Sequence, residues 1–373
     1  MKNSISFLVL VLISLNISCG QKDENEVNTP DKVAFTPQLL IEDLPIAWGM
    51  AFLPDGSMLV TEKSGELIHF KGGKKTIIDN SPTIYFRGQG GLMDIAIDPD
   101  YQNNGWVYIS YSSDDGDDKG GNTAIMRAKL NGNSLTNSEV LYKASPNSTK
   151  GQHFGSRIAF DNDGYLYFSI GDRGDRDINP QDIKRDGGKI YRINRDGSIP
   201  SDNPFVNSEG AKTAIYSYGH RNPQGMVKNP YTGEIWTNEH GPKGGDEINI
   251  VGKGKNYGWP VVTYGVNYSG TPITDQTQKE GMEDPLYYWV PSIAPSGMAF
   301  VTSDKYPDWK GSLLVGSLKF QYLERLELKN NKVVYREKLM PDLGRIRDVR
   351  QAPDGFIYVS VEGKGIYKLV PNK

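Results

Sequence analysis

A short sequence phrase that recurs six times is the strongest constraint on the fold of this chain. Each copy has an alternating apolar strand, a tight turn and a second alternating strand, as in Met-Ala-Phe-Leu-Pro-Asp-Gly-Ser-Met-Leu-Val-Thr over residues 50–61. Asp-Gly or Thr-Gly favours the tight turn of a hairpin, and a period of two fits half-buried strands. The copies begin at Met50, Ile95, Ile158, Met226, Met298 and Val349.

The spacing of the copies predicts how large each repeating unit is. Successive copies lie roughly 45 to 72 residues apart, which is the length of a four-stranded blade with loops of variable length. The sequence therefore predicts an all-β fold, a six-bladed β-propeller with four-stranded antiparallel blades around a central axis. Residues 35–41 and 365–370 are expected to share the last blade and close the ring. The alternative is an unrelated β-rich domain with frequent Asp-Gly turns.

The N-terminus has the pattern of an exported lipoprotein. Lys2 precedes an apolar run at residues 7–15, which is too short to span a bilayer as a mature helix. Cys19, the only cysteine, stands where bacterial lipoproteins are cleaved and acylated, although Asn16 replaces the usual aliphatic residue three positions earlier. We expect a lipoprotein signal peptide at 1–18, a flexible tether at 19–37 and the propeller domain at 38–373. The alternative is ordinary secretion with an incidental cysteine.

Charge and localisation narrow the partners of the chain. A formal net charge of −3 and a pI of about 5.9 show no excess of basic residues of the kind that binds nucleic acid. The signal predicts a periplasmic or outer-membrane-anchored lipoprotein of a Gram-negative bacterium. Contact with the membrane is expected only through a lipid on Cys19, and we expect a monomer.

Polar side chains occupy the same place before several of the hairpins. They are Gln89, His153, Arg221, Asn222, Arg345 and Arg347. A histidine there is either a general base near neutral pH or a structural residue bonded to a neighbouring loop. Arginine suits carboxylates, and two arginines on one strand face need an anion between them. Because a propeller brings these positions to its axis, a cationic axis that binds a planar polyanionic cofactor is expected, with Lys319 as a further cation.

The stretch after the fourth hairpin offers oxygen ligands for hard cations. Exposed carbonyls of Gly241 and Pro242 suit one cation, while Glu247 and the Tyr257 carbonyl suit another. Asp246 is expected to cap a turn instead.

Three motifs in this order carry a resemblance to a known family. They are Tyr-Gly-His-Arg-Asn-Pro-Gln-Gly at 218–225, Asp-Glu-Ile-Asn at 246–249 and Asn-Tyr-Gly-Trp-Pro at 256–260. With them, residues 44–369 resemble the soluble aldose sugar dehydrogenases of the glucose/sorbosone dehydrogenase family. That resemblance implies a six-bladed propeller that carries pyrroloquinoline quinone (PQQ) and Ca²⁺.

The resemblance also implies roles for single residues. His153 matches the base that takes the proton of the anomeric hydroxyl. Glu247 and Tyr257 match a structural calcium site, and the carbonyls of Gly241 and Pro242 match the ligands of a calcium held against the cofactor. His240 stands where the glucose-specific branch has glutamine, which favours the broader aldose branch. The positions that match contacts to the quinone are Gln89, Arg221, Asn222, Tyr268 (with Tyr264 close by in the sequence), Ser317, Leu318, Lys319, Arg345, Ile346 and Arg347.

The implied reaction is the oxidation of an aldose at C1 to its lactone, with hydride transfer to C5 of the quinone. The substrate is an aldose mono- or disaccharide, and an external electron acceptor is needed. Two other functions remain open. One is a non-catalytic extracellular binding module, which predicts loss of the base or of the cations. The other is a calcium-dependent lactonase, which predicts acidic ligands on the axis where this sequence places cations.

Overall fold

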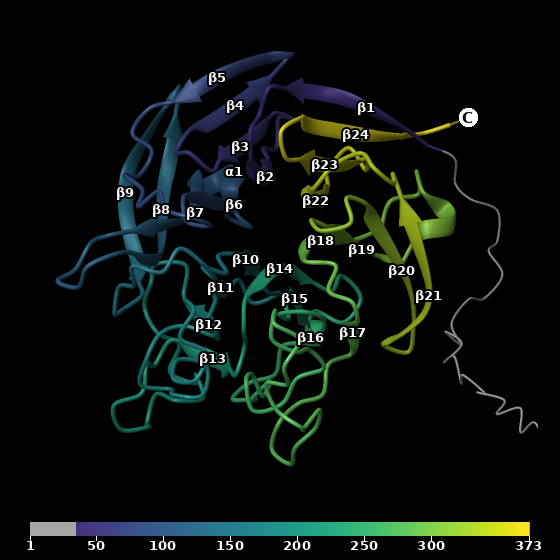
Figure 1. Ribbon diagram of the computed structural model, residues 1–373. Coiled ribbons are helices and arrows are strands. Elements are labelled where there is room, and N and C mark those ends of the chain that lie inside the picture. Colours follow the sequence, from purple (N-terminus) through teal and green to yellow (C-terminus); the bar gives the residue numbers. More distant parts are fainter. Residues whose placement is uncertain (1–34, 373) are drawn as a thin grey trace, which may run out of the picture.

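The computed structural model describes residues 35–372, which form six four-stranded antiparallel sheets arranged around one axis (Figure 1). All six predicted hairpins form the first two strands of the six blades, so the predicted six-bladed propeller is confirmed. In each blade the strand nearest the axis is followed by strands progressively farther out.

The first three blades follow the chain in simple order. Blade 1 consists of β2 (Ala47–Phe52), β3 (Met58–Glu62), β4 (Leu67–Lys71) and β5 (Lys74–Ile78). Blade 2 consists of β6 (Leu92–Ile97), β7 (Trp106–Ser113), β8 (Asn122–Asn131) and β9 (Ser134–Lys143). Blade 3 consists of β10 (Ile158–Phe160), β11 (Leu166–Ile170), β12 (Lys189–Ile193) and β13 (Ile215–Tyr218).

The other three blades complete the ring. Blade 4 consists of β14 (Pro223–Lys228), β15 (Ile235–Glu239), β16 (Asp246–Ile250) and β17 (Tyr287–Trp289). Blade 5 consists of β18 (Pro295–Phe300), β19 (Leu313–Ser317), β20 (Leu323–Lys329) and β21 (Lys332–Leu339). Blade 6 consists of β22 (Ile346–Gln351), β23 (Ile357–Val361), β24 (Gly365–Pro371) and β1 (Phe35–Glu42). Within the described residues the only helical turns are α1 (Tyr101–Asn104) and the 3₁₀ turn η1 (Pro307–Trp309).

The ring is closed by the two ends of the chain. β1 pairs antiparallel with β24, from Phe35 opposite Pro371 to Glu42 opposite Gly365, so the predicted closure is confirmed. Residues 35–37, which the sequence placed in the tether, therefore belong to a strand. The predicted signal peptide and Cys19 lie outside the described residues. Between residues 35 and 372, no helix has the length and apolar character needed to cross a bilayer.

Turn chemistry and burial explain why the hairpins were recognisable. Gly56 and Gly164 adopt φ values of 81° and 82° in their turns, a conformation that glycine reaches without steric cost. Most residues of the strands they join are buried, because neighbouring blades pack face to face. Leu59 of blade 1 and Val107 of blade 2, for example, are fully buried in one shared cluster.

The axis is filled by a buried ion network of mixed charge. Arg157 Nη1 lies 3.2 Å from Asp94 and 3.0 Å from Asp348, and Arg350 pairs with both carboxylates at 2.8 and 2.9 Å. Arg157 also donates to the Gln224 carbonyl, so this network ties together blades 2, 3, 4 and 6. The expectation of a purely cationic axis was therefore wrong, because the sequence-based argument overlooked the acids on β6 and β22.

Candidate active site

His153 lies on the loop that enters blade 3, in an unusual backbone conformation. Its φ of 57° is rare for a side chain with a Cβ, and its N–H donates to Gln89 Oε1 at 2.8 Å. Two residues that the sequence placed at equivalent positions of blades 2 and 3 are thus in direct contact. A strained backbone held by specific bonds is common where a side chain must be aimed precisely.

The imidazole of His153 is paired with Asp172, which follows β11. Nδ1 lies 2.6 Å from Asp172 Oδ1, and Asp172 also accepts from Trp259 Nε1 at 2.9 Å and from the Gly174 N–H at 2.7 Å. These bonds and the positive charge of Arg221 oppose the effect of burial and hold the pKa of Asp172 below its usual value of 3.8. Because an ionised carboxylate only accepts, Nδ1 carries the hydrogen and Nε2 is left unprotonated.

Burial lowers the pKa of His153 below its usual value of 6.5, and the nearby charges of Arg221 and Arg173 lower it further, against the opposing pull of Asp172. The imidazole is therefore neutral at pH 7. A neutral imidazole with its Nδ1–H held by a carboxylate is the arrangement that a general base requires.

The pairing of His153 with Asp172 is one instance of a repeat that sequence reasoning missed. In four blades an acid at the end of the second strand bonds to the loop that enters the same blade. The bonds join Glu62 to the Ile46 N–H, Asp172 to His153, Glu239 to the Arg221 N–H and Glu362 to Arg345, over separations of 16, 19, 18 and 17 residues. An acid recurring at this spacing is the signal that could have identified Asp172, Glu239 and Glu362.

An open cleft of ≈ 320 Å³ lies in front of this pair. Its lining includes His153, Asp172, Arg221, Trp259 and Tyr268. Tyr268 is 74% exposed, whereas Tyr264 stacks on Tyr288 at 3.8 Å between ring centroids. Of the two tyrosines close together in the sequence, Tyr268 is the one that lines the cleft.

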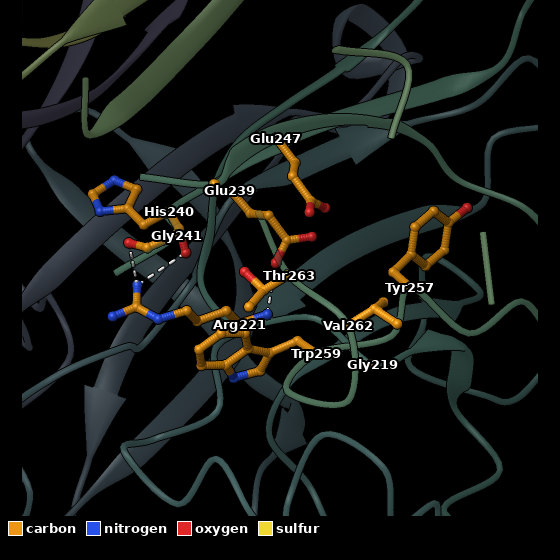
Figure 2. Close-up of a pocket in the computed structure, with 11 residues that line it drawn as sticks. Gly219, Arg221, Glu239, His240, Gly241, Glu247, Tyr257, Trp259, Val262 and Thr263 are labelled. Carbon is orange, nitrogen blue, oxygen red and sulfur yellow. Dashed lines mark hydrogen bonds between the residues drawn. The ribbon is translucent and has the colours of Figure 1, made fainter. Parts of the chain in front are cut away.

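Arg221 connects the cleft to the carbonyls of the loop after β15. Its Nη1 donates to the carbonyl oxygens of His240 and Gly241, each at 2.9 Å, as Figure 2 shows. These oxygens face a positive charge, as the ligands of a cation would. Pro242 lines the His153 cleft, and Asp246 holds the loop by accepting from the Gly241 N–H at 2.7 Å. Asp246 also accepts from the Ile293 and Ala294 N–H groups, so it is the capping residue that was expected.

His240 lies near two of the arginines of the site, Arg221 and Arg347. Its Nε2 lies 2.6 Å from the Pro295 carbonyl, which fixes Nε2 as a donor. Burial, together with the charges of Arg221 and Arg347, lowers the pKa of His240 well below 6.5, so this imidazole is neutral.

A separate enclosed pocket of ≈ 10 Å³ lies behind Arg221 (Figure 2). Glu239, Glu247 and Tyr257 line it, and Asn249 Nδ2 donates to both carboxylates at 3.1 Å. The Tyr257 hydroxyl points away from the two acids and donates to the Ile250 carbonyl, which leaves the backbone carbonyl as its possible ligand. Sequence reasoning placed Glu247 and Tyr257 together but missed Glu239.

The chemistry of this pocket fits a hard cation. Burial raises the pKa of Glu247 to about 8, and the neighbouring charge of Glu239 contributes to the same effect. Two carboxylates in a space the size of one small ion repel each other unless a proton or a cation joins them. In residues 35–372 no three His, Cys, Asp or Glu side chains form a metal cluster, so the remaining ligands would be carbonyls and water, as Ca²⁺ accepts.

The remaining predicted quinone contacts lie on blades 5 and 6. They are Ser317, Leu318, Lys319, Arg345, Ile346 and Arg347. Arg347 donates to Gln224 Oε1 at 2.7 Å and pairs with Glu362 at 2.6 Å, while Arg345 pairs with the other oxygen of Glu362 and donates to the Leu318 carbonyl. The anion that the two arginines require is therefore a residue of this chain, which sequence reasoning missed.

The remaining members of that group differ in accessibility. Lys319 is exposed, whereas the side chains of Leu318 and Ile346 are 3% and 0% exposed and belong to the core. The Ser317 hydroxyl is buried and donates to the Ile293 carbonyl at 2.9 Å. Leu318 and Ile346 would therefore contact a ligand only through their backbones.

Asn222 carries a buried donor with no partner among the described residues. Its Oδ1 accepts from the Gly155 N–H at 3.1 Å, but Nδ2 has no acceptor. An unpaired buried donor costs roughly 1–3 kcal/mol, so it is usually kept for a ligand. Together with Arg221 beside it, this donor suits an oxygen-rich anion, and the predicted quinone contacts fit such a group.

Comparisons with known proteins identify the family of this chain. A sequence model described as Glucose / Sorbosone dehydrogenase matches residues 44–368. Aldose sugar dehydrogenase YliI of Escherichia coli K12 is 42% identical over 330 residues, which cover 86% of this chain and 88% of that protein.

Two solved structures extend the comparison. The soluble aldose sugar dehydrogenase of Escherichia coli in its apo form has a TM-score of 0.86 at 39% identity and covers 91% of this chain and 100% of its own. The PQQ-bound aldose sugar dehydrogenase of Streptomyces coelicolor has a TM-score of 0.73 at 28% identity and covers 91% of this chain and 99% of its own. Because the family match spans nearly the whole propeller, this chain is an enzyme that belongs to the glucose/sorbosone dehydrogenase family of oxidoreductases.

Proposed function

We propose that this protein oxidises aldose sugars at C1 to the corresponding lactones, with PQQ as the hydride acceptor and Ca²⁺ bound at two sites. The oxidation removes two electrons and two protons from the sugar. The quinone, when bound, supplies the electrophilic carbonyl that accepts the hydride, which includes both electrons. The second proton is that of the anomeric hydroxyl, and His153 takes it.

The observation that carries this proposal is the bonded pair of His153 and Asp172 at the cleft. The neutral imidazole offers Nε2 as a base, and Asp172 stabilises the imidazolium that forms when the proton arrives. Trp259, which donates to the other oxygen of Asp172, fixes the carboxylate so that the imidazole keeps its orientation.

Charged side chains would hold the two cofactors. Arg221 and the unpaired Nδ2 of Asn222 suit carboxylate and quinone oxygens near His153, and Arg345, Arg347 and Lys319 suit the far side of a polyanion. Carbonyls of Gly241 and Pro242 would bind one Ca²⁺. Glu247, Glu239 and the Tyr257 carbonyl, which line the small pocket, would bind the second, structural Ca²⁺.

Export and lipid attachment are part of the proposal. Residues 1–18 would direct the chain out of the cytoplasm, and Cys19 would carry the lipid, because both match the lipoprotein signal pattern. Loss of membrane association in a Cys19→Ser variant of the full chain, with secretion retained, is the expected result.

An absorbance titration tests the cofactor assignment directly. Purified apo-protein is titrated with PQQ in the presence of Ca²⁺ or a chelator, and saturable binding that depends on Ca²⁺ is expected. The loaded protein is then assayed with a panel of mono- and disaccharides and phenazine methosulfate as acceptor. Binding without turnover on any sugar would favour the extracellular binding module, and absence of saturable binding would contradict the cofactor assignment.

A further inference from the structure

A band of cations and exposed aromatic rings borders the proposed cofactor site over blades 1, 5 and 6. We define the acceptor crescent as Lys63, Phe86, Arg87, Lys319, Phe320 and Arg345. These residues belong to the loops of blades 1, 5 and 6, including the loop that leads from blade 1 into blade 2, whereas the cleft beside His153 is lined from blades 3 and 4 (Figure 1).

Contacts between its members make the crescent continuous. Lys63 Nζ lies 5.0 Å from the ring centroid of Phe86 and donates to the Gly88 carbonyl at 2.7 Å. Arg345 donates to the Leu318 carbonyl at 3.1 Å, and Lys319 and Phe320 directly follow that residue. Backbone bonds join the two halves: the Gly363 N–H donates to the Pro45 carbonyl at 2.7 Å, and the Lys63 N–H donates to the Ile46 carbonyl at 3.0 Å.

Exposed rings beside cations are characteristic of binding surfaces. Phe86 is 60% exposed and Phe320 is 42% exposed, and Lys319 Nζ lies 5.0 Å from the Phe320 ring centroid. Aromatic residues and arginine are enriched at protein interfaces, where the rings supply apolar area and the cations supply orientation. Glu66 and Asp342 are exposed on the same group of loops and offset part of the positive charge.

The loop of blade 2 that packs beside Tyr85, next to the crescent, has the opposite charge. The loop after β7 carries Asp114, Asp115, Asp117 and Asp118, and Asn147 holds it to the loop that leads toward His153 through bonds to the carbonyls of Asp114, Asp115 and Asp118. Asp175 and Asp177 line the cleft itself, where they pair with Lys150 at 3.2 Å and with Arg176 at 3.5 Å. A negatively charged partner would be repelled by the loop after β7 and attracted to the cations of the crescent.

We propose that the acceptor crescent is the docking surface for an acidic electron-transfer protein, which removes the electrons that sugar oxidation leaves on the cofactor. This inference rests on the proposed function. Each sugar delivers two electrons, so two one-electron carriers are each reduced once, and the two protons are released to water. Such encounters are small and brief, and charge complementarity sets their rate. Sugar would then bind in the cleft beside His153, and the acceptor protein would dock over blades 1, 5 and 6.

Two carriers of opposite charge test the proposal with the reconstituted holoenzyme. Acidic plastocyanin and basic mitochondrial cytochrome c serve as protein acceptors, and phenazine methosulfate serves as the small acceptor. We expect plastocyanin to be the better protein acceptor, with kcat/KM falling at least tenfold between low and high ionic strength. Faster reduction of cytochrome c than of plastocyanin would overturn the inference.

Variants outside the cofactor site locate the surface. Arg87→Glu is expected to lower kcat/KM for plastocyanin about tenfold, and the double variant Phe86→Ser/Phe320→Ser is expected to raise KM several-fold. Matched controls are Lys74→Glu, at the turn beside Lys71 on the far end of blade 1, and Tyr231→Ser, whose side chain is also 60% exposed.

The reaction with phenazine methosulfate distinguishes failure of the proposed function from failure of the docking surface alone. Reduction of phenazine methosulfate by sugar should be unchanged in all four variants, which also shows that they are folded. Absence of that reaction in the parent would refute the proposed function and this inference with it. If the parent shows that reaction, and Arg87→Glu and the phenylalanine variant reduce plastocyanin as well as the controls do, only the docking surface is refuted.

Discussion

Replacing Glu247 by glutamine tests whether the enclosed pocket is a cation site. In the folded chain without a cation, burial and Glu239 raise the pKa of Glu247 from 4.5 to about 8. A difference of this size corresponds to roughly 5 kcal/mol, and the partial exposure of the side chain reduces the expected effect to about 2–3 kcal/mol. Because the folded-state pKa lies above the ordinary value, the stability that Glu247 contributes is complete below about pH 4.5 and is lost as the pH rises through about 8.

The measurement is the unfolding temperature across pH 5 to 9, in a chelator or in excess Ca²⁺. A loss of about 2–3 kcal/mol corresponds to roughly 3–4 °C in a domain of this size. In chelator the parent should lose that much more than Glu247→Gln as the pH rises. In Ca²⁺ the parent should gain roughly 3 kcal/mol at a hundredfold excess over Kd, while the variant gains little.

An exposed carboxylate of the same chain serves as the control. Glu66→Gln changes an exposed carboxylate on the turn after β3 and should follow the parent under every condition. If parent and Glu247→Gln keep a constant difference from pH 5 to 9 in chelator, the two buried carboxylates do not repel each other as argued. If Ca²⁺ raises the unfolding temperature of both equally, the cation binds elsewhere.

Three further predictions concern the base and the axis. His153→Ala should lower kcat on the order of 10²- to 10⁴-fold while PQQ affinity, measured by absorbance, stays within a few-fold; turnover close to that of the parent would remove His153 from its role. Asp172→Asn should also lower kcat at least 10²-fold. Because Asp172 raises the pKa of His153, its loss should move the acid limb of the pH profile of kcat/KM to lower pH. An acid limb at unchanged pH would contradict this role of Asp172. Arg157→Met should cost about 3–5 kcal/mol of unfolding free energy, because Asp94 and Asp348 lose a buried partner. Lys71→Met, at an exposed pair with Asp55, should cost under about 1 kcal/mol in the same thermal measurement.

The blades were predictable because the sequence signals of a hairpin are local. Alternation, Asp-Gly turns and spacing lie within about a dozen residues, and each predicted hairpin forms the first two strands of a blade. The outer strands, such as β9 and β21, have exposed faces and mixed composition, so their bounds were not predictable in the same way.

The site was predictable only in part, because some of its partners depend on how the blade folds. His153, Gln89 and Arg221 stand before hairpins and were found by their place in the repeat. Asp172 and Glu362 bond to loops 19 and 17 residues earlier, through bonds that exist only once the second strand has paired with the first. Two arginines on one strand correctly predicted an anion, but the sequence-based argument did not show that Glu362 was that anion.

The closure of blade 6 also determines how the molecule responds to force. Phe35 and Pro371 are paired neighbours at one end of an antiparallel ladder, with Glu42 and Gly365 at the other. A pull that separates the two ends of the chain therefore loads one pair of hydrogen bonds at a time, from Phe35 inward. Antiparallel strands opened in this way unzip at low force, whereas strands pulled along their length resist with all bonds at once. The domain should accordingly yield first by peeling β1 from β24, while blades 1 to 5 and the remaining three strands of blade 6 still carry the site.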